Sequence, residues 1–133
     1  MPEAVRTALG FDFGLTKIGV AIGQTLTRVA SPLAIVKAVD GKPHWDELDK
    51  IIATWAPDIF IVGYPLHMDG SVNEMAQRAA RFSRRLTGRY HIPAELSDER
   101  LSSFAAREQC GHQRQPIDDI AAQIILQQWL SHY

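Results

Sequence analysis

Three acidic positions in this chain have the residue types and surroundings of a metal-dependent active site. Asp12 lies between two phenylalanines at the end of an apolar run, where a carboxylate is costly to desolvate unless a positive group meets it. Asp98 and Glu99 directly follow a second apolar segment, and Asp118 lies in the first turn of the last predicted helix. The partner of Asp12 is therefore expected to be either an Arg or Lys side chain or a metal ion.

Helical geometry separates Asp118 from its neighbour Asp119. At about 100° per residue, Asp119 falls on the side of Gln123 and Gln127, which predicts that it points to water. The apolar face that includes Asp118 also holds Ala121, Ala122, Ile125 and Trp129. We therefore expect Asp118 to point toward the sheet, and the small alanines to let this helix approach it closely.

Carboxylates that converge raise one another's pKa unless a cation lies between them. Oxygen ligands without His or Cys suit Mg²⁺ or Mn²⁺, which support in-line displacement at phosphorus. Each acid also has a structural explanation: Asp12 as a turn residue, Asp98 as a cap or ion-pair partner, Glu99 as an ion-pair partner of Arg100 or Arg85, and Asp118 as a helix-start residue. Each explanation is reasonable alone, but acids at three such places together favour a metal site.

A cluster of arginines forms a second candidate site. Residues 78–89 contain five arginines and no acid. Three of them, Arg78, Arg81 and Arg85, fall within about 60° on a helical wheel. A solvated helix face is the simpler interpretation, and a ridge that follows the phosphates of a nucleic acid is the functional one.

The hydrophobic pattern predicts the elements that must position these groups. Strands are expected at 6–12, 18–23 and 30–36, and their short links make them an antiparallel meander. The other expected elements are a helix at 45–55, a strand at 58–63, a helix from a capping box at 71–74 to Gly88, a strand at 92–96, and helices at 101–109 and 117–130. This order predicts an α/β fold with a five-stranded mixed sheet, a three-strand meander plus two parallel strands, and helices on both faces. The ends of the first and last strands can then be neighbours, which would bring the acids together.

Composition narrows the possible partners and location. The chain has 133 residues, 46% of them hydrophobic, which fits one domain at 1–133. It has no apolar run of membrane-spanning length and no secretory signal, and Cys110 is its only cysteine, so we expect a cytoplasmic protein without a membrane partner. The net charge of −1 excludes an overall basic field, so nucleic-acid contact would depend on local charge.

Four short motifs, in order and nearly end to end, resemble the YqgF family, described as Holliday-junction resolvases or pre-16S rRNA nucleases. The motifs are Gly10-x-Asp12-x-Gly14-x-x-Lys17, Val62-Gly63-x-Pro65 with Asp69-Gly70, Asp98-Glu99-Arg100-Leu101-Ser102, and Ile117-Asp118 before Ala121-Ala122. Each motif is weak alone, and their combination is specific. One departure is the loop at 111–116, which reads Gln113-Arg114-Gln115-Pro116 where the family often has a lysine-glycine pair.

The resemblance implies an RNase H-like fold whose catalytic and metal-binding triad is Asp12, Glu99 and Asp118, with Mg²⁺ or Mn²⁺. It also implies maturation of the 5′ end of 16S rRNA, with pre-rRNA and ribosomal particles as partners. The expected substrate-binding residues are Lys17, Arg78, Arg81, Arg85, Arg100 and Arg114. Arg114 would supply the charge of the missing lysine.

Three other functions stay open from the sequence. A Holliday-junction resolvase would act on branched DNA and usually needs two active sites, so both a monomer and a homodimer are considered. A ribosome-assembly module that binds RNA without chemistry would fit the near-neutral charge. The Asp-x-Gly turn at Asp12 also resembles the phosphate loop of actin-like ATPases, although 133 residues leave little room for their second lobe.

Overall fold

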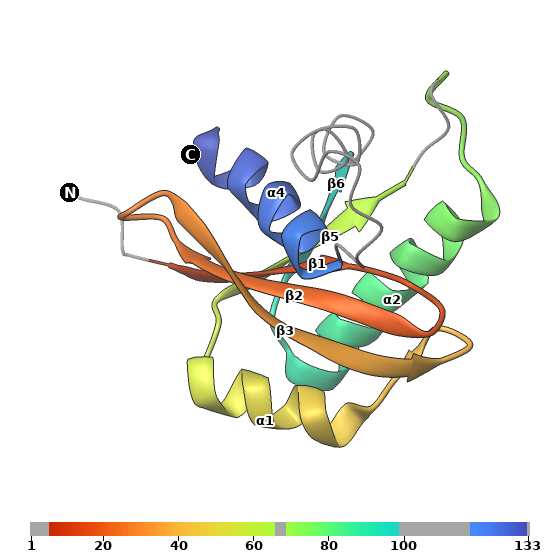
Figure 1. The fold of residues 1–133 in the computed structure, drawn as a ribbon, viewed down its shortest axis with the longest axis horizontal. Helices are drawn as coiled ribbons and strands as arrows, with labels where there is room; N and C mark the ends of the chain where they lie inside the picture. The colour runs from red at the N-terminus through yellow and green to blue at the C-terminus, as the bar shows by residue number, and fades with distance from the viewer. Residues whose placement is uncertain (1–5, 66–68, 99–117, 133) are drawn as a thin grey trace.

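The computed structural model describes residues 6–65, 69–98 and 118–132 (Figure 1). The strands are β1 (Thr7–Asp12), β2 (Lys17–Gln24), β3 (Val29–Val39), β4 (Lys42–Pro43), β5 (Ile59–Tyr64) and β6 (Ala94–Asp98), and the helices are α1 (Trp45–Trp55), α2 (Glu74–Tyr90) and α4 (Asp118–Ser131). The expected helix at 101–109 and the loop at 111–116 lie outside the described residues. None of the helices in the described ranges is both long and apolar enough to cross a membrane.

All six strands form one mixed sheet in the order β4-β3-β2-β1-β5-β6. β1, β2 and β3 pair antiparallel, and β5 pairs parallel with both β1 and β6. This confirms the predicted meander plus two parallel strands. The predicted count of five was one too low, because β4 has only two residues and is too short to show an alternating pattern.

Helices cover both faces of the sheet, as the sequence predicted. Leu9 and Phe11 of β1 face α1 and α2, where they share a buried cluster with Leu48 and Phe82. Ala8, from the other side of the same strand, lies in a second cluster under α4. The strand therefore alternates between two cores, and the residue after Phe11 faces the side of α4.

Close contact fixes the position of α4 on this second face. A Cβ atom added to Gly10 would lie 2.7 Å from Cβ of Leu126 and 3.1 Å from the carbonyl oxygen of Ala122. One added to Gly23, which pairs with Ala8, would lie 2.7 Å from Cδ1 of Leu130. The earlier residue of β1, Ala8, is thus level with the later residue of α4, Leu130, and Gly10 is level with Leu126. The helix α4 therefore runs antiparallel to β1 and begins at the end of the sheet where β1 ends.

Two glutamines of α4 bind the outer edge of β3. Gln127 Oε1 accepts from the Ala30 amide at 2.9 Å, Gln127 Nε2 donates to the Arg28 carbonyl at 2.7 Å, and Gln123 Nε2 donates to the Ala30 carbonyl at 3.0 Å. Gln123 and Gln127, which the helical wheel grouped with Asp119, therefore bind the chain at β3, whereas the side chain of Asp119 lies outside the described residues. The backbone groups of an edge strand need partners, and the helix supplies them at Ala30.

Both ends of α2 differ from the sequence prediction. Asn73 is the N-cap and accepts from the Ala76 amide at 2.7 Å, whereas Ser71 binds Asp69 instead of starting the helix. The helix also continues past Gly88 to Tyr90, and its C-cap is His91, whose φ of 58° is left-handed. The next strand consequently begins at Ala94 rather than at residue 92.

A polar network joins α1 to α2. Asp49 accepts hydrogen bonds from Arg89 at 2.8 and 3.0 Å and from the Tyr90 hydroxyl at 2.6 Å. The guanidinium of Arg89 also lies 4.8 Å from the ring centre of Trp45. The hydrogen bond from Arg89, followed by that from Tyr90, lowers the pKa of Asp49 from 3.8 to about 2. Burial, together with the bond to Asp49, raises the pKa of Tyr90.

Candidate active site and arginine groove

The ends of three strands meet at one edge of the sheet. In the parallel registers, Phe11 of β1 is level with Val62 of β5, and Val62 is level with Leu96 of β6. Asp12 and Asp98 therefore lie at the same edge, each at or beyond the end of this ladder. β5 lies between them, so β1 and β6 are not neighbours, and their ends are about 10 Å apart at the usual strand spacing.

Asp12 is half-buried on the α4 side of this edge. Its neighbour Phe13 faces the other way and packs against Phe82 of α2, with ring centres 5.4 Å apart. The turn that follows depends on Gly14, because a Cβ atom there would lie 2.5 Å from the carbonyl oxygen of Lys17. The spacing Asp12-x-Gly14-x-x-Lys17 thus has a local cause: a strand ends, the backbone turns tightly, and the return strand begins.

The backbone of Asp118 begins α4 at the same edge. Asp118 comes one helical turn before Ala122, which lies over Gly10. A turn of helix advances about 5.4 Å and two strand residues about 6.6 Å, so the first turn of α4 is close to level with Asp12. The start of α4 and the end of β1 therefore lie close together at this edge of the sheet. The side chain of Asp118 is outside the described part of the structure.

Lys17 lies just beyond this edge, whereas Glu99 is placed only by its position in the sequence. Lys17 begins β2, two residues beyond Gly19, which pairs with Asp12. Glu99 follows the last residue of β6 directly, but it lies outside the described residues, as do Arg100 and Arg114. The role of Glu99 therefore stays a prediction from the sequence.

The donor types at this edge suit a hard cation. Asp12 and Asp98 offer carboxylate oxygens, and Mg²⁺ is usually held by one or two carboxylates with water and substrate phosphate completing its shell. Within the described ranges no three His, Cys or acidic side chains form a metal-binding group, and two of the three expected ligand side chains fall outside those ranges. The donor set fits the expected ion without fixing its geometry.

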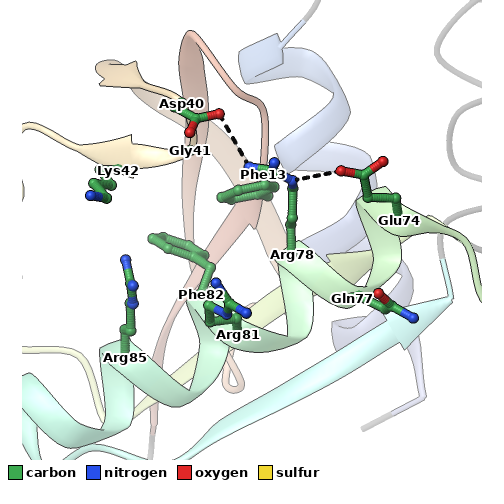
Figure 2. A pocket seen from close by; sticks show the side chains of 10 residues that line it. All are labelled: Phe13, Asp40, Gly41, Lys42, Glu74, Gln77, Arg78, Arg81, Phe82 and Arg85. Carbon is green, nitrogen blue, oxygen red and sulfur yellow. Dashed lines mark hydrogen bonds and ion pairs between the residues drawn. The ribbon is translucent and has the colours of Figure 1, made fainter.

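A second site lies on the opposite face of the sheet, where α2 passes the β3–β4 hairpin (Figure 2). It is a hollow of about 300 Å³, which we call the arginine groove. Its lining consists of Phe13, Asp40, Gly41, Lys42, Glu74, Gln77, Arg78, Arg81, Phe82 and Arg85. The three arginines that share a helical stripe in the sequence thus line one hollow.

The arginines of the groove are not equivalent. Arg78 is held by two carboxylates, with Nη1 3.3 Å from Asp40 and Nε 3.4 Å from Glu74. Arg81 and Arg85 are exposed and form no ion pair with any residue that the structure describes. A structural role thus explains Arg78 in part, but not the other two.

The sequence singled out only the three arginines of the groove, and Lys42 and Phe13 are the most informative of the residues it missed. Lys42 enters from β4 because the β3–β4 turn is an Asp40-Gly41 pair, with both residues at positive φ, 49° and 80°. Asp-Gly between apolar segments is a strong hairpin signal, and it would have placed Lys42 on a return strand. No sequence pattern marked Phe13 as a groove residue. Its side chain faces the groove because that of its neighbour Asp12 faces the opposite side of the sheet.

A protein-family model described as "RuvX: Holliday junction resolvase" matches residues 6–132. A protein of Pseudomonas paraeruginosa named "Putative pre-16S rRNA nuclease" is 42% identical over 98% of this chain and 96% of its own length. A protein of the same name from Hydrogenovibrio crunogenus is 48% identical over 92% of this chain and 91% of its own.

Solved structures with a similar fold are far more distant in sequence. The Thermus thermophilus RuvC chain, solved in complex with a Holliday junction substrate, has a TM-score of 0.56 at 12% identity, covering 96% of this chain and 94% of its own. The fowlpox virus Holliday junction resolvase has a TM-score of 0.55 at 15% identity, covering 96% and 99%. This likeness confirms the expected RNase H-like architecture.

Proposed function

This chain belongs to the RuvX family, also called YqgF, and from that membership we propose that it is a metal-dependent nuclease that processes the 5′ end of pre-16S rRNA. The observation that carries the proposal is the meeting of the end of β1 and the start of α4, which brings Asp12 and the backbone of Asp118 to one edge. The names of relatives at 42% and 48% identity support a pre-rRNA substrate. Residues 1–133 would form one nuclease domain, acting in the cytoplasm on ribosomal particles.

Asp12, Glu99 and Asp118 would hold Mg²⁺ or Mn²⁺. When bound, the ion supplies a nucleophilic hydroxide near neutral pH and stabilises the leaving oxygen. The half-burial of Asp12 on the α4 side restricts its side chain, which would favour an oriented carboxylate for the ion. Lys17, at the turn beside Asp12, would neutralise a substrate phosphate as it approaches. Arg100 and Arg114 would make further phosphate contacts.

The test is cleavage of an RNA that spans the junction between the 5′ leader and mature 16S rRNA, with Mg²⁺, by wild type, Asp12→Asn and Asp118→Asn. Both substitutions keep the size of the side chain and remove its charge, so we expect loss of cleavage with the fold retained. Asp119→Asn is the matched control and should cleave like wild type. Equal cleavage by all four proteins would refute the assignment of these acids.

A second candidate is resolution of branched DNA, which the description of the family model favours. A junction needs two symmetric cuts, so this function requires a homodimer with two active sites. Cleavage of a four-way DNA junction, measured beside the RNA assay and with the mass of the active species from light scattering, discriminates between the two. Cleavage of the junction alone, by a dimer, would favour resolution over rRNA processing.

A further inference from the structure

The arginine groove carries positive charge that the described structure does not neutralise. Four cations and two carboxylates line it, on a chain with a net charge of −1. Both carboxylates are used by Arg78. The other three cations, Lys42, Arg81 and Arg85, have no ion pair within the described part of the chain.

Two of these three cations repel each other weakly in the absence of a ligand. Arg81 and Arg85 are four residues apart on α2, where like charges repel and destabilise the helix. Lys42 adds a third positive charge from the opposite wall, and Figure 2 shows Arg85 extending from α2 toward the side of Lys42. A solvated face would spread such charges over a convex surface, whereas here they line a hollow. An anion in the groove would relieve the repulsion.

The floor of the groove is aromatic. Phe13 and Phe82 both line it; Phe82 is buried, and the half-buried ring of Phe13 beside the cations offers a surface for a nucleobase. Positive grooves with aromatic side chains are typical of sites for single-stranded nucleic acid. Only an unpaired base is free to stack on an aromatic ring in this hollow, because the bases of a duplex are already stacked on one another, so a duplex could place only its phosphates across the opening.

The groove lies directly behind the candidate active site. Phe13 follows Asp12 in the chain, and the two point to opposite faces of the sheet at the end of β1. A strand bound in the groove therefore reaches Asp12 by passing over the turn between β1 and β2. Lys17 stands at the end of that turn and would be its next contact.

We propose that the arginine groove binds a single-stranded nucleic-acid segment flanking the phosphodiester that is cut at Asp12, with Lys42, Arg81 and Arg85 on its phosphates. That this segment flanks a cut rests on the proposed function, whereas the binding itself does not. A precursor with an unpaired leader beside its cleavage point would use both sites at once, and a fully paired substrate would use only the active site.

The experiment measures binding of a short fluorescein-labelled single-stranded RNA to the full chain by fluorescence anisotropy, in EDTA so that no cleavage occurs. Arg81→Gln/Arg85→Gln is compared with Lys50→Gln/Arg84→Gln, which removes the same charge from exposed positions outside the groove. We expect the groove variant to bind about tenfold or more weakly, and its slope of log K against log salt to shrink by about 1.4, or 0.7 per lost phosphate contact. The control variant should stay near wild type.

Lys42→Gln provides a second test from the other wall. This substitution leaves α2 unchanged. It therefore still tests whether RNA binds in the groove if circular dichroism shows that the double variant is unfolded. We expect the salt slope to shrink by about 0.7. Equal losses for groove and control variants, or no loss for Lys42→Gln, would overturn the proposal.

Two further arms identify the ligand. The groove variant should lose more affinity for single-stranded RNA than for a duplex of the same sequence, and equal losses would overturn the single-strand assignment. Displacement of the RNA by micromolar AMP or inorganic phosphate would show a small-anion site and would also overturn it. Groove-dependent binding without any Mg²⁺-dependent cleavage would instead refute only the proposed function.

Discussion

Gly10→Ala tests whether the close contact between β1 and α4 sets the active site. The added methyl group would lie 2.7 Å from Cβ of Leu126 and 3.1 Å from the carbonyl oxygen of Ala122. Carbon atoms in ordinary contact are about 3.5–4.0 Å apart, so α4 must move away from β1 by about 1 Å. The backbone of Asp118 begins the same helix and would move with it, away from Asp12.

The expected effects follow from that displacement. Overpacking of a buried site costs about 1–3 kcal/mol of the free energy of unfolding, measured by urea denaturation. A misplacement of about 1 Å can reduce catalysis by about 10²-fold, so Mg²⁺-dependent cleavage should fall by about that factor at temperatures where the variant is still folded. Circular dichroism at the assay temperature establishes that the loss is not unfolding.

Gly88→Ala is the matched control, because nothing lies within 4 Å of an added Cβ atom and the glycine is inside α2. It should stabilise the protein by about 0.5–1 kcal/mol and leave cleavage unchanged. Wild-type stability and wild-type cleavage for Gly10→Ala would refute the claim that this contact positions α4. Reduced stability with full cleavage would confirm the overpacking and refute only the claim that the displacement of α4 reduces catalysis.

Three further outcomes are expected. The pKa of Asp49 is about 2 in the folded protein and near 3.8 in the unfolded chain, so its pairing contributes stability above pH 4 that is lost as the pH falls toward 2. The difference in the free energy of unfolding between wild type and Arg89→Gln should therefore shrink from pH 4 to pH 2. A constant difference in urea denaturation over that range would contradict this. Asn73→Ala should cost about 1 kcal/mol through loss of the cap, and Ser71→Ala distinctly less, in the same assay. Gln127→Ala should cost about 1–2 kcal/mol, because the Ala30 amide of β3 and the Arg28 carbonyl just before this strand lose their side-chain partner. An unchanged urea midpoint would refute that role.

The sheet could be predicted because its strands carry strong local patterns. Ile59 to Val62 is a continuous apolar run, as in buried parallel strands, and the residues of β1 alternate between two cores. Both patterns depend only on which residues are buried, so they can be recognised without knowing the tertiary contacts. Only β4 was missed, since its two residues cannot form a hydrophobic pattern and its one signal, the Asp40-Gly41 turn, lies outside the strand.

The failures have tertiary causes. Ser71 and Asn73 are both good capping residues, and Asn73 is the cap in a structure where its amide also donates to the carbonyl of Pro65, a contact with no local signature. Gln123 and Gln127 look like surface residues on a helical wheel, but the wheel does not show that β3 leaves Ala30 with an unpaired backbone edge. The position of Asp12 at the sheet edge was predictable from its own segment, whereas its partners depend on which strand and helix ends meet it.

The most direct test of the central claim is a crystal structure of the wild-type chain soaked in Mn²⁺, with the ion located by anomalous scattering. We predict a peak about 2.0–2.2 Å from a carboxylate oxygen of Asp12, shared with Asp118 and Glu99. A peak that joins Asp12 to Asp98 in place of Glu99 would refute the triad. Mn²⁺ bound elsewhere on the protein, with none at Asp12, would contradict a metal-dependent active site at this edge of the sheet.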